Sequence, residues 1–365
     1  MVQAKLEREK RNMANKNRLG NYFEDFHVGM KLKHATPRTL TEGDRSLYIG
    51  LTGSRSALGT AQTNAALLGL ERRPMEDLLV FNIAFGKTVP DISLNAVANL
   101  GYAQVRFLEH VYADDTLSVE SEVIGVKENS NGKTGVVYVH CVARNQHHED
   151  VLSWTRWVMV RKRGTAPVDA QPQVPVFDAV VAPSHLRCGT YKSPAAIRSV
   201  TGVSDLWEDY RVGERIDHLG AMTINDSDHS IATRLYQNTA KAHFDGFAMS
   251  ETPAGKRLVY GGHIMSICKA LSYDGLENAL GILAINGGSH VSPSYAGDTI
   301  SCITTVIDKF DLDAPNVGGI RLRMLAAKNL AATSIELPTI IDGKASYQPA
   351  IVLDLDYTIA LPKRM

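Results

Sequence analysis

Long runs of alternating apolar and polar residues recur along the chain, and each predicts a β-strand with one buried face. Residues 116–126 and 135–144 alternate in this way, and the turn-forming residues 128–132 between them predict a hairpin. A further strand is expected at residues 154–163. The apolar face of such a sheet must be covered by another layer.

Two mostly apolar segments, residues 77–88 and 259–273, predict buried helices that could supply this layer. A shorter polar-faced helix precedes each of them, with Asp44 or Asp228 near its start. The second buried helix starts with the sequence Tyr-Gly-Gly-His at 260–263, where the glycines let a ligand approach the backbone closely. One helix against a strongly bent antiparallel sheet is an α+β arrangement.

The same elements occur twice in the same order. Residues 22–29 are matched by 206–213, residues 112–117 by 295–300, and residues 151–163 by 352–364. Several blocks in a conserved order indicate a tandem duplication. The spacing between the copies changes most near the end, where residues 330–347 are extra in the second copy and predict a longer loop near the site.

The duplication divides the chain into four parts. We expect a mobile N-terminal arm at residues 1–20, a first repeat at 21–163, a linker at 164–203 and a second repeat at 204–365. The linker contains five prolines, a density that favours an extended segment over the surface.

Composition narrows the functional classes. Lys and Arg total 39, as do Asp and Glu, and a neutral balance argues against a general nucleic-acid binder. The four cysteines are widely spaced, so neither a disulfide framework nor a metal site is expected. The chain shows neither a secretory signal nor an apolar run long enough to span a membrane. These features predict a soluble, cytoplasmic protein without metal.

Residues 235–245 carry the most suggestive chemistry. His243 follows Asn238 by five residues, directly behind a helix, and histidine exchanges protons near neutral pH. In the first copy the corresponding residues are Ser54 and Gly59, which cannot do this. The second copy is therefore expected to supply the proton-transfer groups, while the first contributes walls of the site.

The glycines at the start of the second buried helix are the other candidate. The backbone N–H groups of Gly261 and Gly262 could hold a developing negative charge on a carbonyl oxygen, or the glycines could serve only close packing. Phe81 and Asn82 are expected at the equivalent place in the first copy. His263 and His290 also lie beside glycine pairs and could line the same pocket or be structural.

Several stretches resemble known sequences. Residues 235–243, 260–263 and 294–299 resemble the MaoC-like (R)-specific enoyl-CoA hydratases. Residues 78–95, 128–139, 157–163 and 234–240 look like a narrower group, the mesaconyl-CoA hydratases, also called 2-methylfumaryl-CoA hydratases or β-methylmalyl-CoA dehydratases. The resemblance covers residues 20–365 and implies a double hotdog, with two tandem repeats that each wrap a bent antiparallel sheet around a helix.

The wider family has the site motif Asp-x-Asn-Pro-x-His, in which Asp and His activate water. Carried over by position, His243 matches the histidine, Asn238 replaces the aspartate, and Ala240-Lys241 replaces Asn-Pro. Asn cannot act as a base but can orient water through its amide. Either His243 works on a water held by Asn238, or another carboxylate such as Asp245 stands in.

The resemblance implies a hydro-lyase that reversibly hydrates mesaconyl-CoA to β-methylmalyl-CoA. Coenzyme A is then part of the substrate, no other cofactor is required, and a homodimer is expected. The substrate carries a free carboxylate, for which Arg55 and Arg234 are candidate partners because they flank the two equivalent segments. A hotdog acyl-CoA thioesterase and a non-catalytic acyl-CoA binding protein are the alternatives.

Overall fold

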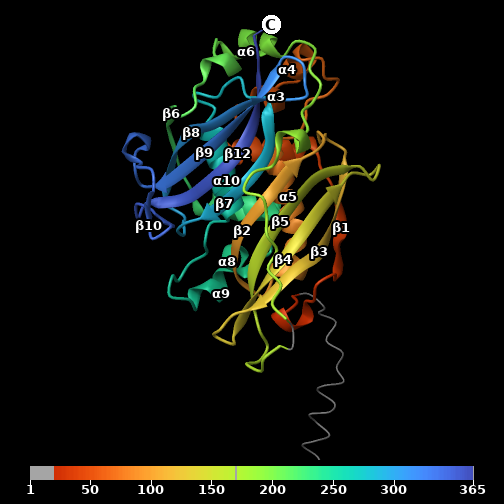
Figure 1. Ribbon diagram of the computed structural model, residues 1–365, viewed down its shortest axis with the longest axis vertical. Helices are drawn as coiled ribbons and strands as arrows, with labels where there is room; N and C mark the ends of the chain where they lie inside the picture. Colours follow the sequence, from red (N-terminus) through yellow and green to blue (C-terminus); the bar gives the residue numbers. More distant parts are fainter. Residues whose placement is uncertain (1–19, 169–170, 365) are drawn as a thin grey trace, which may run out of the picture.

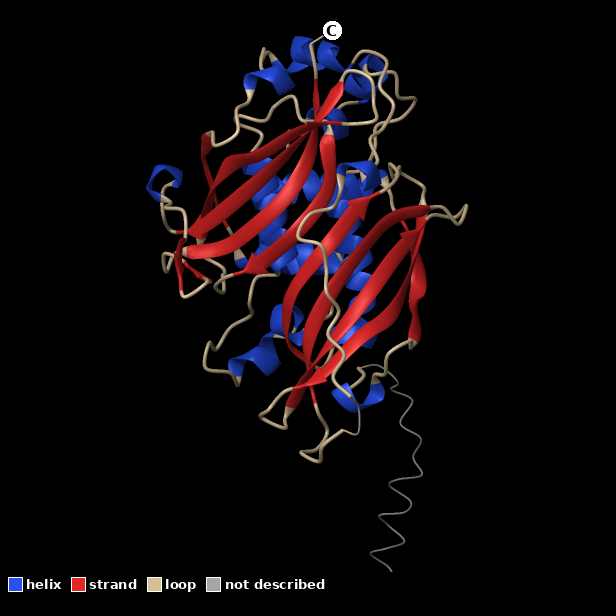
Figure 2. Cartoon of the chain, viewed as in Figure 1, coloured by secondary structure: helices blue, strands red, loops and turns tan. Residues whose placement is uncertain are grey.

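A computed structural model describes residues 20–168 and 171–364, and the N-terminal arm expected at residues 1–20 lies outside them except for Gly20. Its main feature is one continuous antiparallel sheet of ten strands, with helices packed against one face (Figures 1 and 2). The strand order is β1-β3-β4-β5-β2-β7-β12-β9-β8-β6, so the two repeats meet edge to edge at β2 and β7.

The first repeat supplies five strands and the helix layer behind them. Its strands are β1 (Lys31–Thr39), β2 (Ala96–Phe107), β3 (Thr116–Glu128), β4 (Thr134–Arg144) and β5 (Asp150–Arg161). Its helices and helical turns are η1 (Phe23–Asp25), α2 (Glu42–Thr52), α3 (Ala57–Thr60), α4 (Gln62–Leu67), α5 (Asp77–Thr88) and the π-helical η2 (Val89–Ser93).

The second repeat follows the same order. Its sheet strands are β6 (Arg215–Thr223), β7 (Gly281–His290), β8 (Thr299–Asp311), β9 (Val317–Lys328) and β12 (Ile351–Pro362). Its helices and helical turns are η5 (Trp207–Asp209), α7 (Asp226–Leu235), α8 (Lys241–Phe244), α9 (Gly246–Ser250) and α10 (Gly261–Leu271). The duplication predicted from the sequence is thus a duplication of structure, and the double hotdog fold is confirmed.

The seam between the repeats depends on close backbone approach. Strand β2 pairs with β7, with Tyr102 opposite Gly288. A side chain on Gly288 would meet the Tyr102 ring at 2.5 Å, so glycine is needed there. Behind the seam α5 packs against α10, and the Asn82 amide donates to Gly262 O at 3.1 Å and to Ser266 Oγ at 3.0 Å. Both repeats thereby share one apolar core.

The two buried helices are present, with one change of bounds and one of register. Helix α5 spans the predicted residues, whereas α10 is shorter than residues 259–273 because Tyr260 is its extended N-cap. The prediction that Phe81 and Asn82 occupy the helix start of the first copy is wrong. Helix α5 begins at Asp77, and Phe81 and Asn82 lie one turn further in, where Asn82 reaches α10.

The connecting segments bury more surface than their sequence predicted. Residues between the repeats form η3 (Pro183–His185), η4 (Pro194–Ile197) and α6 (Arg198–Thr201). Phe177 stacks on Trp157 at an interplanar angle of 14°, and Val181, Tyr191 and Ile197 join an apolar cluster with Leu58. These apolar contacts anchor parts of the segment to the protein. Residues 171–180 have no helix or strand and are exposed or half-buried, so this part runs over the surface as predicted.

The extra residues of the second copy form η6 (Ala332–Ser334) and a small hairpin, β10 (Thr339–Ile341) and β11 (Lys344–Ser346). Ile335 packs on Ile303 of β8 and Leu325 of β9. These two residues lie on the face of the sheet opposite to the one that α10 covers, because they alternate along their strands with the residues that face α10. The insertion therefore covers the outer face of β8 and β9, and the expectation that it lies near the site is wrong. No helix of the described residues is long and apolar enough to span a membrane.

Candidate active site

His243 lies in α8 and is held by a backbone carbonyl. Its Nδ1 is 2.9 Å from Leu258 O, and Leu258 N–H in turn donates to Ala242 O. A carbonyl can only accept, so Nδ1 carries the proton and Nε2 presents a free lone pair. The surrounding protein disfavours the charged imidazolium and lowers the pKa of His243 to about 4, although the side chain keeps partial exposure. His243 is therefore a neutral imidazole near pH 7.

The start of α10 lies beside this imidazole. The Tyr260 ring is 5.5 Å from the His243 ring, centroid to centroid, and Gly261 follows it as the first helical residue. Tyr260 O accepts from the N–H groups of His263 and Ile264. Within the described ranges the N–H groups of Gly261 and Gly262 have no acceptor, so they remain available to an oxyanion.

His290 and Tyr102 bring both repeats into the same place. A side chain on Gly261 would lie 2.3 Å from His290 Cε1, so the His290 ring covers the start of α10. Tyr102 OH lies 3.2 Å from His290 Nε2 and 3.0 Å from Met265 Sδ. His290 comes from β7 of the second repeat and Tyr102 from β2 of the first. From the sequence, His290 was a candidate only because it lies beside a glycine pair, and Tyr102 was not predicted to belong to the site.

Asn238 is buried in a tight turn that packs against α5 of the first repeat. Its side-chain Oδ1 accepts from Ala240 N–H at 3.1 Å, and the preceding Gln237 adopts a positive φ of 52°. The turn leaves no room for a side chain on Gly86 of α5, where a Cβ would lie 1.9 Å from Tyr236 O. The described residues show no direct hydrogen bond between Asn238 and His243, so a partnership between them would act through water.

The other candidates occupy surface or capping positions. Asp245 is the N-cap of α9, and its Oδ1 accepts from Ala248 N–H at 3.0 Å. Arg55 is exposed and stacks on the Tyr273 ring at 4.6 Å, and Arg234 is exposed at the end of α7. The structure brings His243, Gly261 and Gly262 together, places Asn238 in the adjoining turn, and gives Arg55 and Arg234 no contact with this group.

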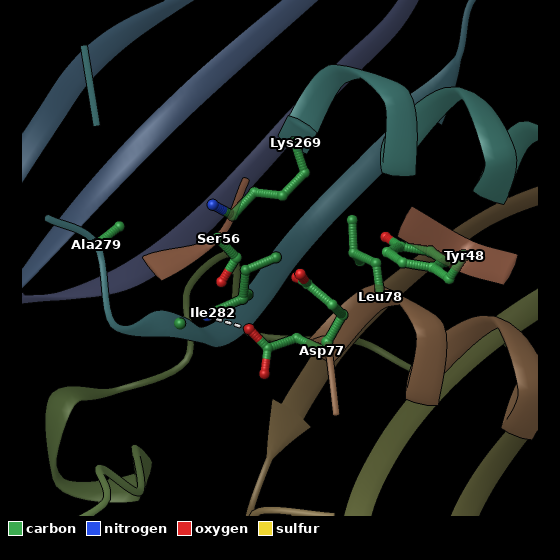
Figure 3. Close-up of a pocket in the computed structure, with 9 residues that line it drawn as sticks. Tyr48, Ser56, Asp77, Leu78, Lys269, Ala279 and Ile282 are labelled. Atoms are coloured by element: carbon green, nitrogen blue, oxygen red, sulfur yellow. Dashed lines mark hydrogen bonds between the residues drawn. The ribbon is translucent and has the colours of Figure 1, made fainter. Parts of the chain in front are cut away.

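The equivalent place in the first repeat is lined by side chains from both repeats (Figure 3). Glu76 takes the space beside Gly59, where a Cβ would be 3.0 Å from Glu76 Oε1, and Ser54 Oγ donates to the same oxygen at 2.8 Å. Asp77 and Lys269 enter from α5 and α10, and Asp77 accepts from Ile282 N–H at 2.8 Å. The remaining cavity is about 20 Å³, room for about one water.

Burial of Glu76 and Asp77 in this pocket disfavours the charged forms of both carboxyl groups. Desolvation raises the pKa of Glu76, and it raises the pKa of Asp77 to about 7, with a further contribution from the neighbouring Glu76 carboxylate. The two equivalent places thus differ in kind: the first repeat holds two acids and space for about one water, and the second holds a neutral imidazole and two glycines.

Comparison with known proteins identifies the family of this chain. A model of the mesaconyl-CoA hydratase family matches residues 4–179. The β-methylmalyl-CoA dehydratase of Chloroflexus aurantiacus is 49% identical over 360 residues, which cover 96% of this chain and 100% of that protein. The mesaconyl-CoA hydratase of Cereibacter sphaeroides is 46% identical and covers 95% of this chain and 100% of its own length.

Solved structures agree with the fold. A MaoC domain protein dehydratase from Chloroflexus aurantiacus has a TM-score of 0.91 at 49% identity, covering 96% of this chain and 100% of its own. A double-hotdog protein from Mycobacterium tuberculosis has a TM-score of 0.73 at 23% identity, covering 94% and 98%, which shows the fold alone. The resemblance drawn from the sequence is confirmed: this chain belongs to the mesaconyl-CoA hydratase family.

Proposed function

We propose that this protein catalyses the reversible hydration of mesaconyl-CoA to β-methylmalyl-CoA. The observation that carries the proposal is the neutral His243 imidazole, fixed by Leu258 O and placed beside the free N–H groups at the start of α10. The two relatives described above are named for the two directions of this reaction and match nearly the whole chain. The hydratase is therefore favoured over the acyl-CoA thioesterase and the non-catalytic binding protein.

The chemistry begins with proton abstraction from water. His243 Nε2 accepts the proton as the water oxygen bonds to the β carbon of the enoyl thioester. The electron pair of the carbon–carbon double bond moves onto the thioester oxygen, where the N–H groups of Gly261 and Gly262 stabilise the negative charge. The enolate then takes a proton at the α carbon, returned by His243, so that one water is added in total. The free energy gained from one oxyanion donor is typically about 3 kcal/mol.

Asn238 is proposed to position the water. Its Oδ1 accepts from Ala240 N–H, so the donors of its amide remain to hold the water oxygen. Asp245 is the less favoured base, because its carboxylate caps α9.

Coenzyme A enters as part of the substrate, and no other cofactor takes part in these steps. A homodimer and a cytoplasmic location stay predictions; sedimentation of the purified protein tests the first.

The experiment follows loss of the enoyl-thioester absorbance when mesaconyl-CoA is added. His243→Ala should lower kcat by roughly 10²–10⁴-fold, the usual contribution of general acid–base catalysis. His27→Ala is the matched control, because His27 is exposed in the turn before β1 and should have no effect. Full activity in His243→Ala would refute the role of this residue.

A thiol-reactive dye in the same assay separates hydration from thioester hydrolysis. Hydration leaves the thioester intact and releases no thiol, whereas a thioesterase would release one thiol per substrate consumed. Binding without any change of the substrate, seen by calorimetry, would instead identify a non-catalytic acyl-CoA binding protein.

A further inference from the structure

Arg156 is a buried cation on the inner face of the sheet. It lies in β5, directly opposite Tyr102 of β2 and Val139 of β4, and its exposure is 0%. Its guanidinium carbon lies 4.2 Å from the centre of the Phe85 ring in α5. An arginine at this position of an otherwise apolar face points its charge into the core instead of into water.

The hydrogen bonds of this guanidinium are incomplete. One nitrogen, Nη2, donates to Ser93 Oγ at 3.1 Å, while Nε and Nη1 have no partner. No carboxylate of the described residues forms an ion pair with it. Arg45, the other fully buried arginine, is paired with Glu42 and with backbone carbonyl oxygens. A buried charge without a counter-ion is unfavourable, and burial lowers the pKa of Arg156 to about 10.

Aromatic contacts connect Arg156 to the candidate active site. The Phe85 ring, over which the Arg156 guanidinium lies, is 6.1 Å from the Tyr260 ring, and the Tyr260 ring is 5.5 Å from the His243 ring, centroid to centroid. On the other side Tyr102, the cross-strand neighbour of Arg156, contacts His290. The cation is therefore contributed by the first repeat to the same group of side chains as the proton-transfer residue of the second.

We propose that Arg156 binds the free carboxylate of the acyl group, an inference that rests on the proposed function. In mesaconyl-CoA this carboxylate is attached to the carbon that receives the hydroxyl group, only a few bonds from the thioester. The unpartnered donors of Arg156 supply the counter-ion that the carboxylate needs once it leaves water. Because the guanidinium is covered, binding includes a movement of the aromatic rings around it, and the carboxylate then completes its hydrogen bonds.

The test compares two saturated thioesters that cannot be hydrated. Methylsuccinyl-CoA keeps the carboxylate, and 2-methylbutyryl-CoA has a methyl group in its place; calorimetry gives the Kd of each. The wild-type protein should bind methylsuccinyl-CoA roughly 10- to 150-fold more tightly, the range expected for hydrogen bonds to a charged group. In Arg156→Met this preference should disappear while the Kd of 2-methylbutyryl-CoA stays within a few-fold. Arg156→Lys should keep part of the preference.

Ser93→Ala is the control, because it removes only the hydrogen bond that Arg156 already has. Equal weakening of both ligands in Arg156→Met would show a structural role and overturn the proposal. So would a wild-type protein that does not distinguish the ligands, a measurement that needs no variant to fold. A clear preference for methylsuccinyl-CoA without hydration of mesaconyl-CoA would instead refute the proposed function and leave the carboxylate site in place.

Discussion

Gly261→Ala should lower kcat while leaving the free energy of unfolding nearly unchanged. The added Cβ would lie 2.3 Å from His290 Cε1 and 2.5 Å from His290 Nε2, so the ring cannot stay where it is. His290 is exposed, and a side chain at the surface can swing aside at low cost. The new methyl group then occupies the space in front of the N–H groups that we assign to the thioester oxygen.

The expected change in stability is small because two effects oppose each other. Alanine is favoured over glycine in a helix by up to about 1 kcal/mol. Displacing His290 breaks its contact with Tyr102 OH, and an ordinary hydrogen bond contributes about 1 kcal/mol. The free energy of unfolding should therefore stay within about 1 kcal/mol of wild type, while kcat should fall by about 10²–10³-fold, as when an oxyanion donor is lost.

Gly262→Ala is the matched comparison, one residue further into α10. Its Cβ would lie 2.0 Å from Asn82 Oδ1 and 2.5 Å from Tyr260 Cε1, both in the buried core. Such overpacking costs about 1–3 kcal/mol, so this variant should unfold at lower urea concentration. Urea unfolding and the absorbance assay are run on both proteins. A Gly261→Ala protein with wild-type kcat would refute the assignment of the helix start.

Three further predictions follow from pKa values and packing. The pKa of His243 is lowered to about 4, so kcat/KM should stay level from about pH 8 to pH 5. It should fall only at lower pH, where the imidazole gains a proton. A fall in kcat/KM with a midpoint near pH 6.5 would contradict this prediction. The folded-state pKa of Asp77, about 7, lies above that of an unfolded Asp, so stability is lost as pH rises from about 4 to 7. Asp77→Asn should therefore raise the free energy of unfolding at pH 8, by no more than about 4 kcal/mol, and much less at pH 4.5. Calorimetry that shows an equal gain in stability at both pH values would argue against this. Gly288→Ala should lower the free energy of unfolding by about 1–3 kcal/mol, because the added Cβ would lie 2.5 Å from the Tyr102 ring at the seam. Gly287→Ala should have no such effect, because the atom nearest to its Cβ would be 4.0 Å away. Equal urea midpoints for the two variants would contradict this prediction.

Local pattern was sufficient to locate much of the candidate site. The spacing of Asn238 and His243 and the glycine pair at 261–262 are visible in the sequence, and the structure groups them at neighbouring turns and helix starts. The register predicted for the first copy is wrong because residues 79–81, Leu-Val-Phe, resemble residues 258–260, Leu-Val-Tyr, although α5 begins earlier, at Asp77. A usable signal for Arg156 was also present: it shares an alternating strand face with Trp154 and Val158, where a charge is out of place.

The sequence by itself determined the duplication, the α+β double hotdog and the repeat that carries the candidate proton-transfer histidine. The duplication and the α+β arrangement follow from periodicity and repeated stretches, which are local properties of the chain, whereas the double hotdog was implied by the resemblance to a known family. Only the tertiary structure decided that Arg156 and Tyr102 of the first repeat share a site with His243 and His290 of the second. That grouping exists because β2 pairs with β7 and α5 packs on α10, and the pairing of such distant segments is set by close contacts across the seam that no local pattern encodes.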